Sequence, residues 1–594
     1  MRREDTYSGP SGARTRGAFF GGAPRWHRDE RSSATLDSAR LNSGLHSLAI
    51  VIVAITALVC ARLLWLQVFD VANLKGKAAL KRLNVITIEA KRGTIYDRNG
   101  NVLAMSIDCT TIYCNPHEIS DKGTAARILS ADLGGEASSY LTALSQDTTF
   151  SYVKMKVNTD KADKVKGDLA KSGIKGIYYL SDSKREYPYG DVGGQVLGVV
   201  GSDGDGLSGL EHYYNDVLAG SNGSMTFETG SDGTPIAGGI SETTATKNGT
   251  DIVISLDVDI QKVAEDAIRQ GIVSYKAESG SVVVTNPKTG EILALCSTPL
   301  FRITDLSTVE EGALSLKAVS SSYEPGSIFK LLTMSVGIEA GLIRPDSTYS
   351  VPAKVRVGGD LVGDDDGRDY TMNMSIREML RRSSNAGTAL VTQDVIGAKN
   401  FAQGIDRFGI GQVTGIDYPG EVPGIVKTHS QYDGASLGSM AFGQSLAFPM
   451  IQMVKAVGAI ANKGVLETPH FLISRGGQKA SWDSPGRAIS EDTAKEVTDM
   501  MRTVVQEGTA VKAQVKGYDI AGKTGTGEQA DASGGYASNE YVSSLIGFAP
   551  ASDAEILVYV GLNRTPYLAS SSAAPLFSTI MGPSLINMRI KPSA

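Results

Sequence analysis

The sequence has few of the residues that support metal, disulfide or histidine chemistry. Its 594 residues include four cysteines and six histidines. No Cys-x-x-Cys pair is present, so neither a structural zinc site nor a thioredoxin-like site is indicated. No histidine lies in a His-Glu-x-x-His or Gly-x-Ser-x-Gly setting, so a zinc protease and a Ser-His-Asp hydrolase both lack their signal. We expect no metal and no cofactor. Cys109 and Cys114 are either a pair across a strand turn or free, partly buried thiols.

Strong net charge is also lacking. The 58 Lys and Arg residues against 64 Asp and Glu give a formal charge of -6, which does not indicate nucleic acid as a partner. Hydrophobic and charged contents of 41% and 21% are ordinary for a globular protein. The length exceeds what one hydrophobic core supports, so several domains are expected.

The sequence contains one long apolar run, over residues 45–69. It reads LHSLAIVIVAITALVCA and continues as RLLWLQVF. A membrane-spanning helix needs about 20 mostly apolar residues, and this run suffices if Arg62 extends toward the interface, near which Trp65 would lie. A cleaved signal peptide and a buried core helix are the alternatives. The first lacks an A-x-A site and follows an unusually long tail.

The tail over residues 1–44 is rich in Arg, Gly and Ser, and we expect it to be disordered. The positive-inside rule places it in the cytoplasm. The chain is therefore predicted to be a single-pass protein of a bacterial cell membrane, with everything after residue 69 outside the cytoplasm.

Two further parts follow, with a boundary near residue 249. Residues 70–248 have mixed α/β patterning, with a strand over 83–88 and helices over 124–133 and 161–172. In residues 249–594, strands over 281–285 and 291–295 flank a turn at 286–290, helices follow, and strands return at 543–548 and 556–560. Strands at both ends of a part with helices between them predict an α+β fold. The acidic cluster at 363–367 lacks the spacing of a calcium loop and is expected to be a solvated loop.

Three short patterns carry candidate chemistry. They are S-x-x-K at Ser327 and Lys330, S-x-N at Ser383 and Asn385, and K-T-G at residues 523–525. Together they are the signature of penicillin-binding proteins and class A β-lactamases. Each is weak alone: S-x-x-K recurs from Ser151, Ser172 and Ser181, and K-T-G recurs from Lys288. Only the first set occurs in order within one domain-sized stretch.

The local sequence also favours these residues. Residues 324–326 break the chain before Ser327, which then begins a helix with a broad apolar face. Lys330 lies on the same helix face, three residues on. A serine hydroxyl needs a base to take its proton, and Lys330 can be that base if burial or a second cation, Lys523, lowers its pKa. A capping box at 375–378 predicts a helix, with Ser383 and Asn385 on the loop that leaves it.

At these residues the chain resembles class B penicillin-binding proteins, which are monofunctional peptidoglycan D,D-transpeptidases. The stretches YEPGS at 323–327 and AGKTGT at 521–526 are characteristic. The span end RLLWLQV and two motifs, RGTIYDRNG at 92–100 and GLSGLE at 206–211, extend the resemblance along most of the chain. The division transpeptidases and stage V sporulation protein D are the most similar groups. At 443–449 the sequence departs from the family pattern.

The resemblance implies a pedestal domain of the dimerisation type over 70–248 and a transpeptidase domain over 249–594, which has an antiparallel sheet, flanking helices and a helical lobe. It also implies cross-linking of D-Ala-D-Ala stem peptides through a serine acyl-enzyme, in septal or spore-wall synthesis, and inhibition by β-lactams. The implied partners in the membrane are a SEDS-type glycosyltransferase and other division proteins. By the same resemblance, Ser327 is the nucleophile, Lys330 its base and Ser383 a proton relay. Asn385 holds Lys330 and the substrate amide, and Lys523 binds the terminal carboxylate of the substrate. The remaining substrate contacts come from Thr524, Gly525 and Thr526.

Two alternatives remain open. A β-lactamase or β-lactam sensor shares the serine chemistry, but no clear deacylating-glutamate loop is present. A catalytically silent division scaffold would keep the fold without the reaction, and the intact trio of patterns argues against it.

Overall fold

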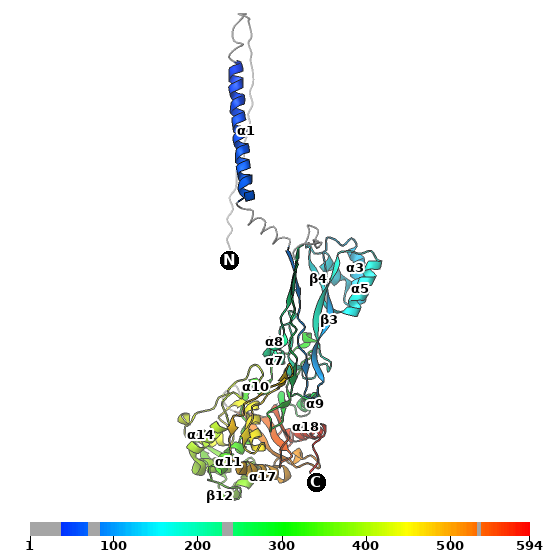
Figure 1. The fold of residues 1–594 in the computed structure, drawn as a ribbon. Helices are drawn as coiled ribbons and strands as arrows, with labels where there is room; N and C mark the ends of the chain where they lie inside the picture. Colours follow the sequence, from blue (N-terminus) through cyan, green and yellow to red (C-terminus); the bar gives the residue numbers. More distant parts are fainter. Residues whose placement is uncertain (1–36, 69–82, 229–240, 531–535, 594) are drawn as a thin grey trace, which may run out of the picture. The chain divides into compact units, whose positions relative to one another are not determined.

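The computed structural model describes residues 37–68, 83–228, 241–530 and 536–593. The predicted disordered tail therefore lies outside the described residues up to position 36. The chain forms two units: α1 (Asp37–Val68) belongs to the first, and residues 85–225 and 242–594 form the second. Figure 1 shows their helices and strands.

α1 contains a stretch that is long and apolar enough to cross a membrane. Gly44–Trp65 has a mean hydropathy of 2.5 over its most apolar part. Its identification as a possible membrane span rests on this length and composition. Thr56 donates its hydroxyl hydrogen to the Ile52 carbonyl at 2.8 Å, which satisfies a polar group on this apolar surface. The helix begins at Asp37, before the predicted start of the span, because a formed helix extends into flanking polar residues at little cost.

The pedestal is built on long antiparallel strands. β3 (Val102–Cys114) pairs with β4 (Ser151–Asn158) on one side and with β5 (Ile177–Glu186) on the other. The helices α3 (Lys122–Leu133), α4 (Ala137–Leu144) and α5 (Thr159–Lys171) lie beside these strands (Figure 1). Ile112, Leu129 and Val165 form a core between helices and sheet, which follows from their apolar spacing. The helices predicted over 124–133 and 161–172 are confirmed.

The same sheet continues into the rest of the second unit. Its order is β19-β18-β8-β2-β3-β4, with β5 also on β3. The additional strands are β2 (Ile95–Tyr96), β8 (Ile252–Ile254), β18 (Leu472–Arg475) and β19 (Gln478–Lys479). Strands from before and after residue 249 thus share one sheet. A separate sheet has the order β1-β6-β7, from β1 (Leu83–Ile88), β6 (Gly223–Glu228) and β7 (Ser241–Thr244).

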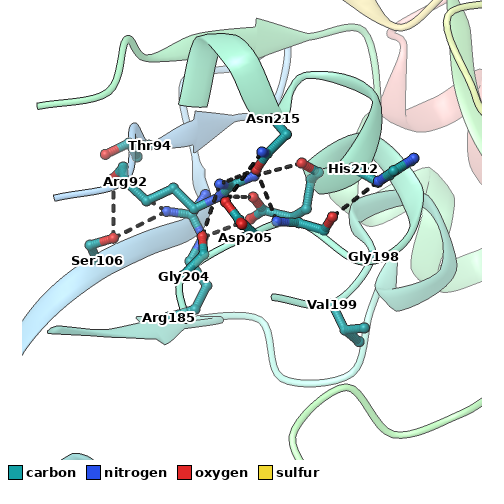
Figure 2. A network of polar contacts seen from close by, with 12 residues as sticks. Arg92, Thr94, Ser106, Arg185, Gly198, Val199, Gly204, Asp205, His212 and Asn215 are labelled. Atoms are coloured by element: carbon teal, nitrogen blue, oxygen red, sulfur yellow. Dashed lines mark hydrogen bonds and ion pairs between the residues drawn. The ribbon is translucent and has the colours of Figure 1, made fainter. Parts of the chain in front are cut away.

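A buried ionic network joins the two motifs of the pedestal (Figure 2). Arg92, from the first motif, donates to the carboxylate of Glu211, from the second, and to Asn215 Oδ1 at 2.7 Å. Arg185 on β5 donates to the other Glu211 oxygen at 2.7 Å. The side chains of Arg92 and Glu211 are 5% and 0% exposed, so neither charge has water as a substitute partner.

The first motif also contacts the part of the chain after residue 249. Asp97 is fully buried and accepts backbone hydrogens from Asn99 and Asn101, both at 2.8 Å, which closes the predicted turn. Asn99 donates to Asp257 at 3.0 Å, and Asp257 is the N-cap of α9 (Val258–Ser274). The motif therefore fixes the start of α9, a helix after residue 249.

The part after residue 249 contains a five-stranded antiparallel sheet in the order β10-β9-β23-β22-β21. The strands are β9 (Ser279–Thr285), β10 (Ile292–Ser297), β21 (Ala521–Ala530), β22 (Tyr536–Ala549) and β23 (Ile556–Thr565). α9 and α18 (Ala573–Asn587) pack together beside β10 and β23 (Figure 1). β9 and β10 share this sheet with β21, β22 and β23, and helices lie between the two groups of strands in the chain, which confirms the α+β prediction.

The intervening helices form the helical lobe. α17 (Glu491–Glu507) packs on β21 and on α12 (Ile376–Arg382). The other helices of the lobe are α11 (Lys330–Glu339), α13 (Asn385–Val391), α14 (Gly397–Arg407), α15 (Ser436–Ala441) and α16 (Met450–Ala461). Two hairpin-like pairs flank it: β12 (Thr348–Val351) with β15 (Met372–Ser375), and β13 (Lys354–Val357) with β14 (Asp360–Gly363).

All four cysteines are free thiols. Cys109, Cys114 and Cys296 are buried, and Cys60 lies on α1. Cys109 and Cys114 are both on β3, so no turn brings them together. Burial raises the pKa of Cys109 to about 11, which keeps that thiol protonated.

Candidate active site

Ser327 and Lys330 lie where a short 3-10 turn, η2 (Gly326–Phe329), leads into α11. Gly326 has a φ of 58°, which turns the chain sharply before the serine. Ser327 is 7% exposed and Lys330 is fully buried. The Lys330 Nζ lies 2.8 Å from the Ser327 Oγ. The predicted start of a helix at the serine is confirmed, with a tighter first turn than an α-helix.

Ser383 and Asn385 reach Lys330 from the other side. Lys330 Nζ lies 2.6 Å from Asn385 Oδ1, 2.5 Å from the Ser383 carbonyl oxygen and 3.3 Å from Ser383 Oγ. Ser383 ends α12 with a φ of 64°, a left-handed conformation that costs a non-glycine residue about 1–3 kcal/mol. This turn directs Ser383 back toward the lysine.

Two details of this region differ from the sequence prediction. Asn385 does not lie on a loop but is the first residue of α13, with Ser384 as its N-cap. The capping box at 375–378 is half formed: Ser375 Oγ accepts the Glu378 backbone hydrogen at 3.1 Å. The Glu378 carboxylate instead accepts from Arg381 and Arg382, because two charged donors bind it more strongly than one backbone N–H.

Lys523 enters the site from β21. It is fully buried, and its Nζ lies 2.8 Å from Ser383 Oγ and 2.9 Å from the Thr524 carbonyl oxygen. The Ser383 hydroxyl is thus shared by the two lysines. Residues distant in sequence thus form one connected group. Lys330 links Ser327 on η2 to the α12–α13 turn, and the Ser383 hydroxyl links that turn to Lys523 on β21.

Burial controls the charge of both lysines. Desolvation lowers the pKa of Lys330 to about 7, although the negative charges of Asp365 and Asp364 raise it. Desolvation also lowers the pKa of Lys523 well below its usual value, and the charge of Lys330 lowers it further. A buried amine with a pKa near neutrality is suited to take a proton from a hydroxyl. Of the two causes expected from the sequence, burial is the one that lowers the pKa of Lys330.

β21 presents the K-T-G residues along the outer edge of the five-stranded sheet. An edge strand has unpaired backbone groups that an extended peptide can bind. Thr524 is buried and contacts Thr509 through its hydroxyl at 2.6 Å, whereas Thr526 is half-buried. A Cβ on Gly525 would lie 2.5 Å from Ser544 Oγ and 3.0 Å from the Pro325 carbonyl oxygen. Glycine here permits close contact between β21 and the turn before Ser327.

The repeated patterns lie elsewhere in the fold. Ser151 begins β4, Ser172 follows the last residue of α5, and Ser181 lies on β5, all within the pedestal. Lys288 lies in the turn between β9 and β10 and pairs with Asp553 on the surface. These positions, away from Ser327 and Lys330, agree with the exclusion of the repeated patterns as catalytic candidates.

Two groups of residues near the site were not predicted. Gly443 accepts the Gly326 backbone hydrogen at 3.0 Å, and the Ser445 N–H donates to Glu324 at 3.0 Å. The segment at 443–449, which departs from the family pattern, thus fixes the turn before the nucleophile. The expectation of a solvated loop at 363–367 is wrong for Asp364, whose side chain is 7% exposed and contacts Ser384. A run of acidic residues predicts a solvent-exposed loop, so the burial of Asp364 is seen only from its tertiary contact with Ser384.

Comparisons with known proteins agree with the geometry. Residues 280–582 match the penicillin binding protein transpeptidase domain, and residues 87–254 match the penicillin-binding protein dimerisation domain. The chain is 31% identical to stage V sporulation protein D of Bacillus subtilis over 528 residues, which covers 85% of this chain and 80% of that protein. It is 28% identical to the peptidoglycan D,D-transpeptidase FtsI of Escherichia coli over 552 residues, with 91% and 90% covered. A crystal structure of penicillin binding protein 3 from Mycobacterium tuberculosis, complexed with aztreonam, matches with a TM-score of 0.66 and 28% identity over 86% of this chain and 98% of that one.

Proposed function

The chain belongs to the class B penicillin-binding proteins and is a serine-type peptidoglycan D,D-transpeptidase, and on that premise we propose that Ser327 is its nucleophile and Lys330 its base. The observation that carries the assignment is the contact of 2.8 Å between the Lys330 Nζ and the Ser327 Oγ, at a fully buried lysine. No other base is needed for the proton of the hydroxyl.

In the first half-reaction, the Ser327 Oγ attacks the carbonyl carbon of the penultimate D-alanine of a stem peptide, and neutral Lys330 takes the hydroxyl proton. The peptide C–N bond breaks, and an ester to Ser327 forms. The proton passes through the Ser383 hydroxyl, which lies 3.3 Å from Lys330 Nζ, to the nitrogen of the departing D-alanine. In the second half-reaction, the amine of a neighbouring stem attacks the ester, its proton returns to Ser327, and a cross-link results.

Lys523 binds the terminal carboxylate of the donor peptide. A carboxylate beside Lys523 stabilises its charged form, and repulsion between the two ammonium groups then favours neutral Lys330. Substrate binding thus prepares the base. Asn385 holds Lys330 through its Oδ1 at 2.6 Å and offers its amide hydrogens to the peptide.

Thr524, Gly525 and Thr526 contact the donor peptide, which lies along the free edge of β21 as an added strand. The backbone N–H groups of Ser327 and Thr526 form the oxyanion hole for the tetrahedral intermediate. A β-lactam resembles the D-Ala-D-Ala end and acylates the same serine.

The proposal is tested with purified full-length chain, a stem-peptide analogue that ends in D-Ala-D-Ala, and an amine acceptor. Free D-alanine and joined product are measured for the wild type, Ser327→Ala and Ser172→Ala. Ser172 is the matched control, because it lies in the same S-x-x-K pattern at the end of α5. We expect both products from the wild type and Ser172→Ala, and neither from Ser327→Ala. Release of D-alanine by Ser327→Ala at the wild-type rate would refute the assignment.

The two alternative functions give different results. A β-lactamase would release hydrolysed β-lactam at each turnover, whereas a transpeptidase keeps a long-lived acyl-enzyme. A silent scaffold would allow cells that depend on the chain to grow with Ser327→Ala, and we expect them not to grow.

The chain is membrane-anchored through its one described apolar helix of spanning length. We further propose that the N-terminus is cytoplasmic and that residues 70–248 and 249–594 are a pedestal and a transpeptidase domain outside the cytoplasm, since the tail before α1 is rich in arginine. A SEDS-type glycosyltransferase would contact α1 and the pedestal. Protease added outside intact spheroplasts should cleave the transpeptidase part. Copurification with such a partner should be lost when α1 and the pedestal are replaced.

A further inference from the structure

The loop that follows β14 contains two acidic side chains beside the lysine pair. Asp364 and Asp365 follow Gly363, the last residue of β14, and the loop ends at Gly367. Asp364 is nearly buried, whereas Asp365 and its neighbour Asp366 are exposed. The reaction outlined above assigns no role to any of them.

Asp364 holds the turn that presents Ser383 and Asn385 to Lys330. Its carboxylate accepts the Ser384 hydroxyl hydrogen at 2.8 Å and the Ala386 backbone hydrogen at 2.9 Å. Successive residues of this turn alternate between two partners. Ser383 and Asn385 contact Lys330, whereas the Ser384 hydroxyl and the Ala386 N–H contact Asp364. Asp364 therefore fixes from behind the two residues that contact the base.

This support also explains how the turn keeps an unfavourable conformation. Ser383 has a left-handed backbone, and such a residue persists only where its surroundings fix it. Ser384 Oγ bridges Asp364 and the Gly387 N–H, the latter at 2.9 Å. These two hydrogen bonds of Ser384 cap the N-terminus of α13 and hold Ser383 in its left-handed conformation.

Asp364 is itself held in place. Arg368, 3% exposed at its side chain, donates to Asp364 at 3.1 Å and to the carbonyl oxygens of Pro352 at 2.8 Å and Val351 at 3.0 Å. A carboxylate fixed between an arginine, a hydroxyl and a backbone N–H has little freedom to turn away. The chain thus maintains a buried negative charge near two buried amines.

The charged groups that face Lys330 come from β21 and from this loop. The charge of Lys523 acts on it from β21, and the charges of Asp365 and Asp364 act on it from the loop, where Arg368 binds Asp364. The charged side chains of α12 are engaged elsewhere, since Glu378 pairs with Arg381 and Arg382, and Arg382 also pairs with Asp366. Negative charge near Lys330 therefore comes from this loop.

We propose that Asp364 and Asp365 are positioning residues of the transpeptidase reaction: Asp364 fixes the Ser383–Asn385 turn, and both carboxylates set the charge balance of the Lys330–Lys523 pair. The inference rests on the proposed roles of Ser327 and Lys330. Both carboxylates stabilise the protonated form of Lys330. With them present, Lys330 takes up a proton near neutral pH rather than only at lower pH.

The two residues should differ in what their loss changes. Asp364→Asn removes both a contact and a charge, whereas Asp365→Asn removes an exposed charge alone. In each variant protonated Lys330 is less stable, so neutral Lys330 forms at lower pH. The rising limb of acylation rate against pH should move to lower pH in both, by about half a pH unit. The maximum rate should fall about tenfold in Asp364→Asn only, because only that variant loosens the turn.

The experiment measures the second-order rate constant for acylation by a chromogenic β-lactam from about pH 5 to about pH 9. Full-length wild type, Asp364→Asn, Asp365→Asn and Asp366→Asn are compared. Asp366→Asn is the matched control, an exposed carboxylate of the same loop that pairs with Arg382 at 3.4 Å, and its profile should equal that of the wild type. The shift in Asp365→Asn should shrink at high salt, because an exposed charge is screened.

A rate loss in Asp364→Asn without a shift of the limb would overturn the charge effect and leave only a structural contact. Unshifted limbs in both variants together with an unchanged maximum rate in Asp364→Asn would overturn the proposal entirely, and an equal shift in Asp366→Asn would overturn its charge effect. If Asp364→Asn does not fold, as judged by thermal unfolding, Asp365→Asn still tests the charge. If the wild type is not acylated at Ser327, the proposed function fails instead, so the two failures are distinguishable.

Discussion

At the scale of single residues, the site is defined by two amines that have lost water. Lys330 and Lys523 are both fully buried and share the Ser383 hydroxyl. Burial of an ammonium without a salt-bridge partner is unfavourable. The lysine is therefore partly deprotonated, and a partly deprotonated lysine is a competent base. The burial that disfavours charged Lys330 is the same feature that lowers its pKa to about 7 and makes it suited to accept a proton.

The charge of Lys330 should appear in the pH profile. Its pKa is lowered to about 7, so the fraction of neutral amine increases as pH rises through that value. The acylation rate of the wild type should therefore increase through about pH 7 and then level off. A measured profile that falls over this range would contradict Lys330 as the base.

Replacement of Lys330 by arginine tests the same role differently. Arginine keeps the positive charge but does not deprotonate in proteins, so Lys330→Arg should lose about 100-fold or more in acylation rate. Lys262→Arg, an exposed lysine on α9, should retain the wild-type rate. Both variants should bind the membrane and unfold cooperatively, and a fully active Lys330→Arg would exclude proton transfer through this side chain.

At the scale of elements, β21 packs closely against η2, so the strand that carries Lys523 lies beside the turn that carries Ser327. Gly525 permits this contact, because an added Cβ would lie 3.0 Å from Ile328 Cγ2 and from the Pro325 carbonyl oxygen. Backbone atoms do not move aside as a flexible side chain does. The third residue of K-T-G is therefore required by packing in addition to any substrate contact.

Gly525→Ala should separate the strand from the nucleophile turn by a few tenths of an ångström and reduce acylation about tenfold or more. Gly458→Ala on α16 is the matched control, since nothing lies within 4 Å of its added Cβ. This second variant should keep its acylation rate and gain up to about 1 kcal/mol of stability from helix propensity. The rates are compared with one β-lactam at one pH, and an unaffected Gly525→Ala would show that the contact is not limiting.

The elements also show what the sequence could predict. β9 and β10 were predicted because they are short apolar runs on either side of a turn, and α3 and α5 were predicted from the helical spacing of their apolar residues. The three motifs were predicted to meet because their order is characteristic. The structure of the α12–α13 turn was not predicted, since it depends on the contact of Asp364 with Ser384. A side chain that lies 20 positions away in sequence gives no local signal.

At the scale of the whole second unit, buried charges fix the pedestal motifs to one another. Glu211 carries one negative charge between Arg92 and Arg185, and its side chain is 0% exposed. Loss of one partner in a buried ion pair leaves an uncompensated charge. The pedestal should thus be sensitive at Glu211, far along the chain from the reacting serine.

Glu211→Gln should lower the free energy of unfolding by about 3 kcal/mol or more, because two guanidinium groups lose their counter-charge. Glu186→Gln is the control, as its surface pair with Lys184 at 3.8 Å should contribute about 0–1 kcal/mol. Thermal and denaturant unfolding report the difference. Since Glu211 does not contact the reacting groups, the folded variant should be acylated at the wild-type rate, and a change in stability no larger than that of Glu186→Gln would contradict the structural role.

The most direct test of the account is the position of the covalent adduct. The full-length chain is reacted with a β-lactam and digested, and the mass-shifted peptide is sequenced by mass spectrometry, with Ser327→Ala treated in parallel. We predict one adduct, on the serine of the YEPGS segment at 323–327, and none in Ser327→Ala. An adduct on any other residue, or an unchanged adduct in Ser327→Ala, would contradict the contact of Lys330 with the Ser327 hydroxyl as the basis of the reaction.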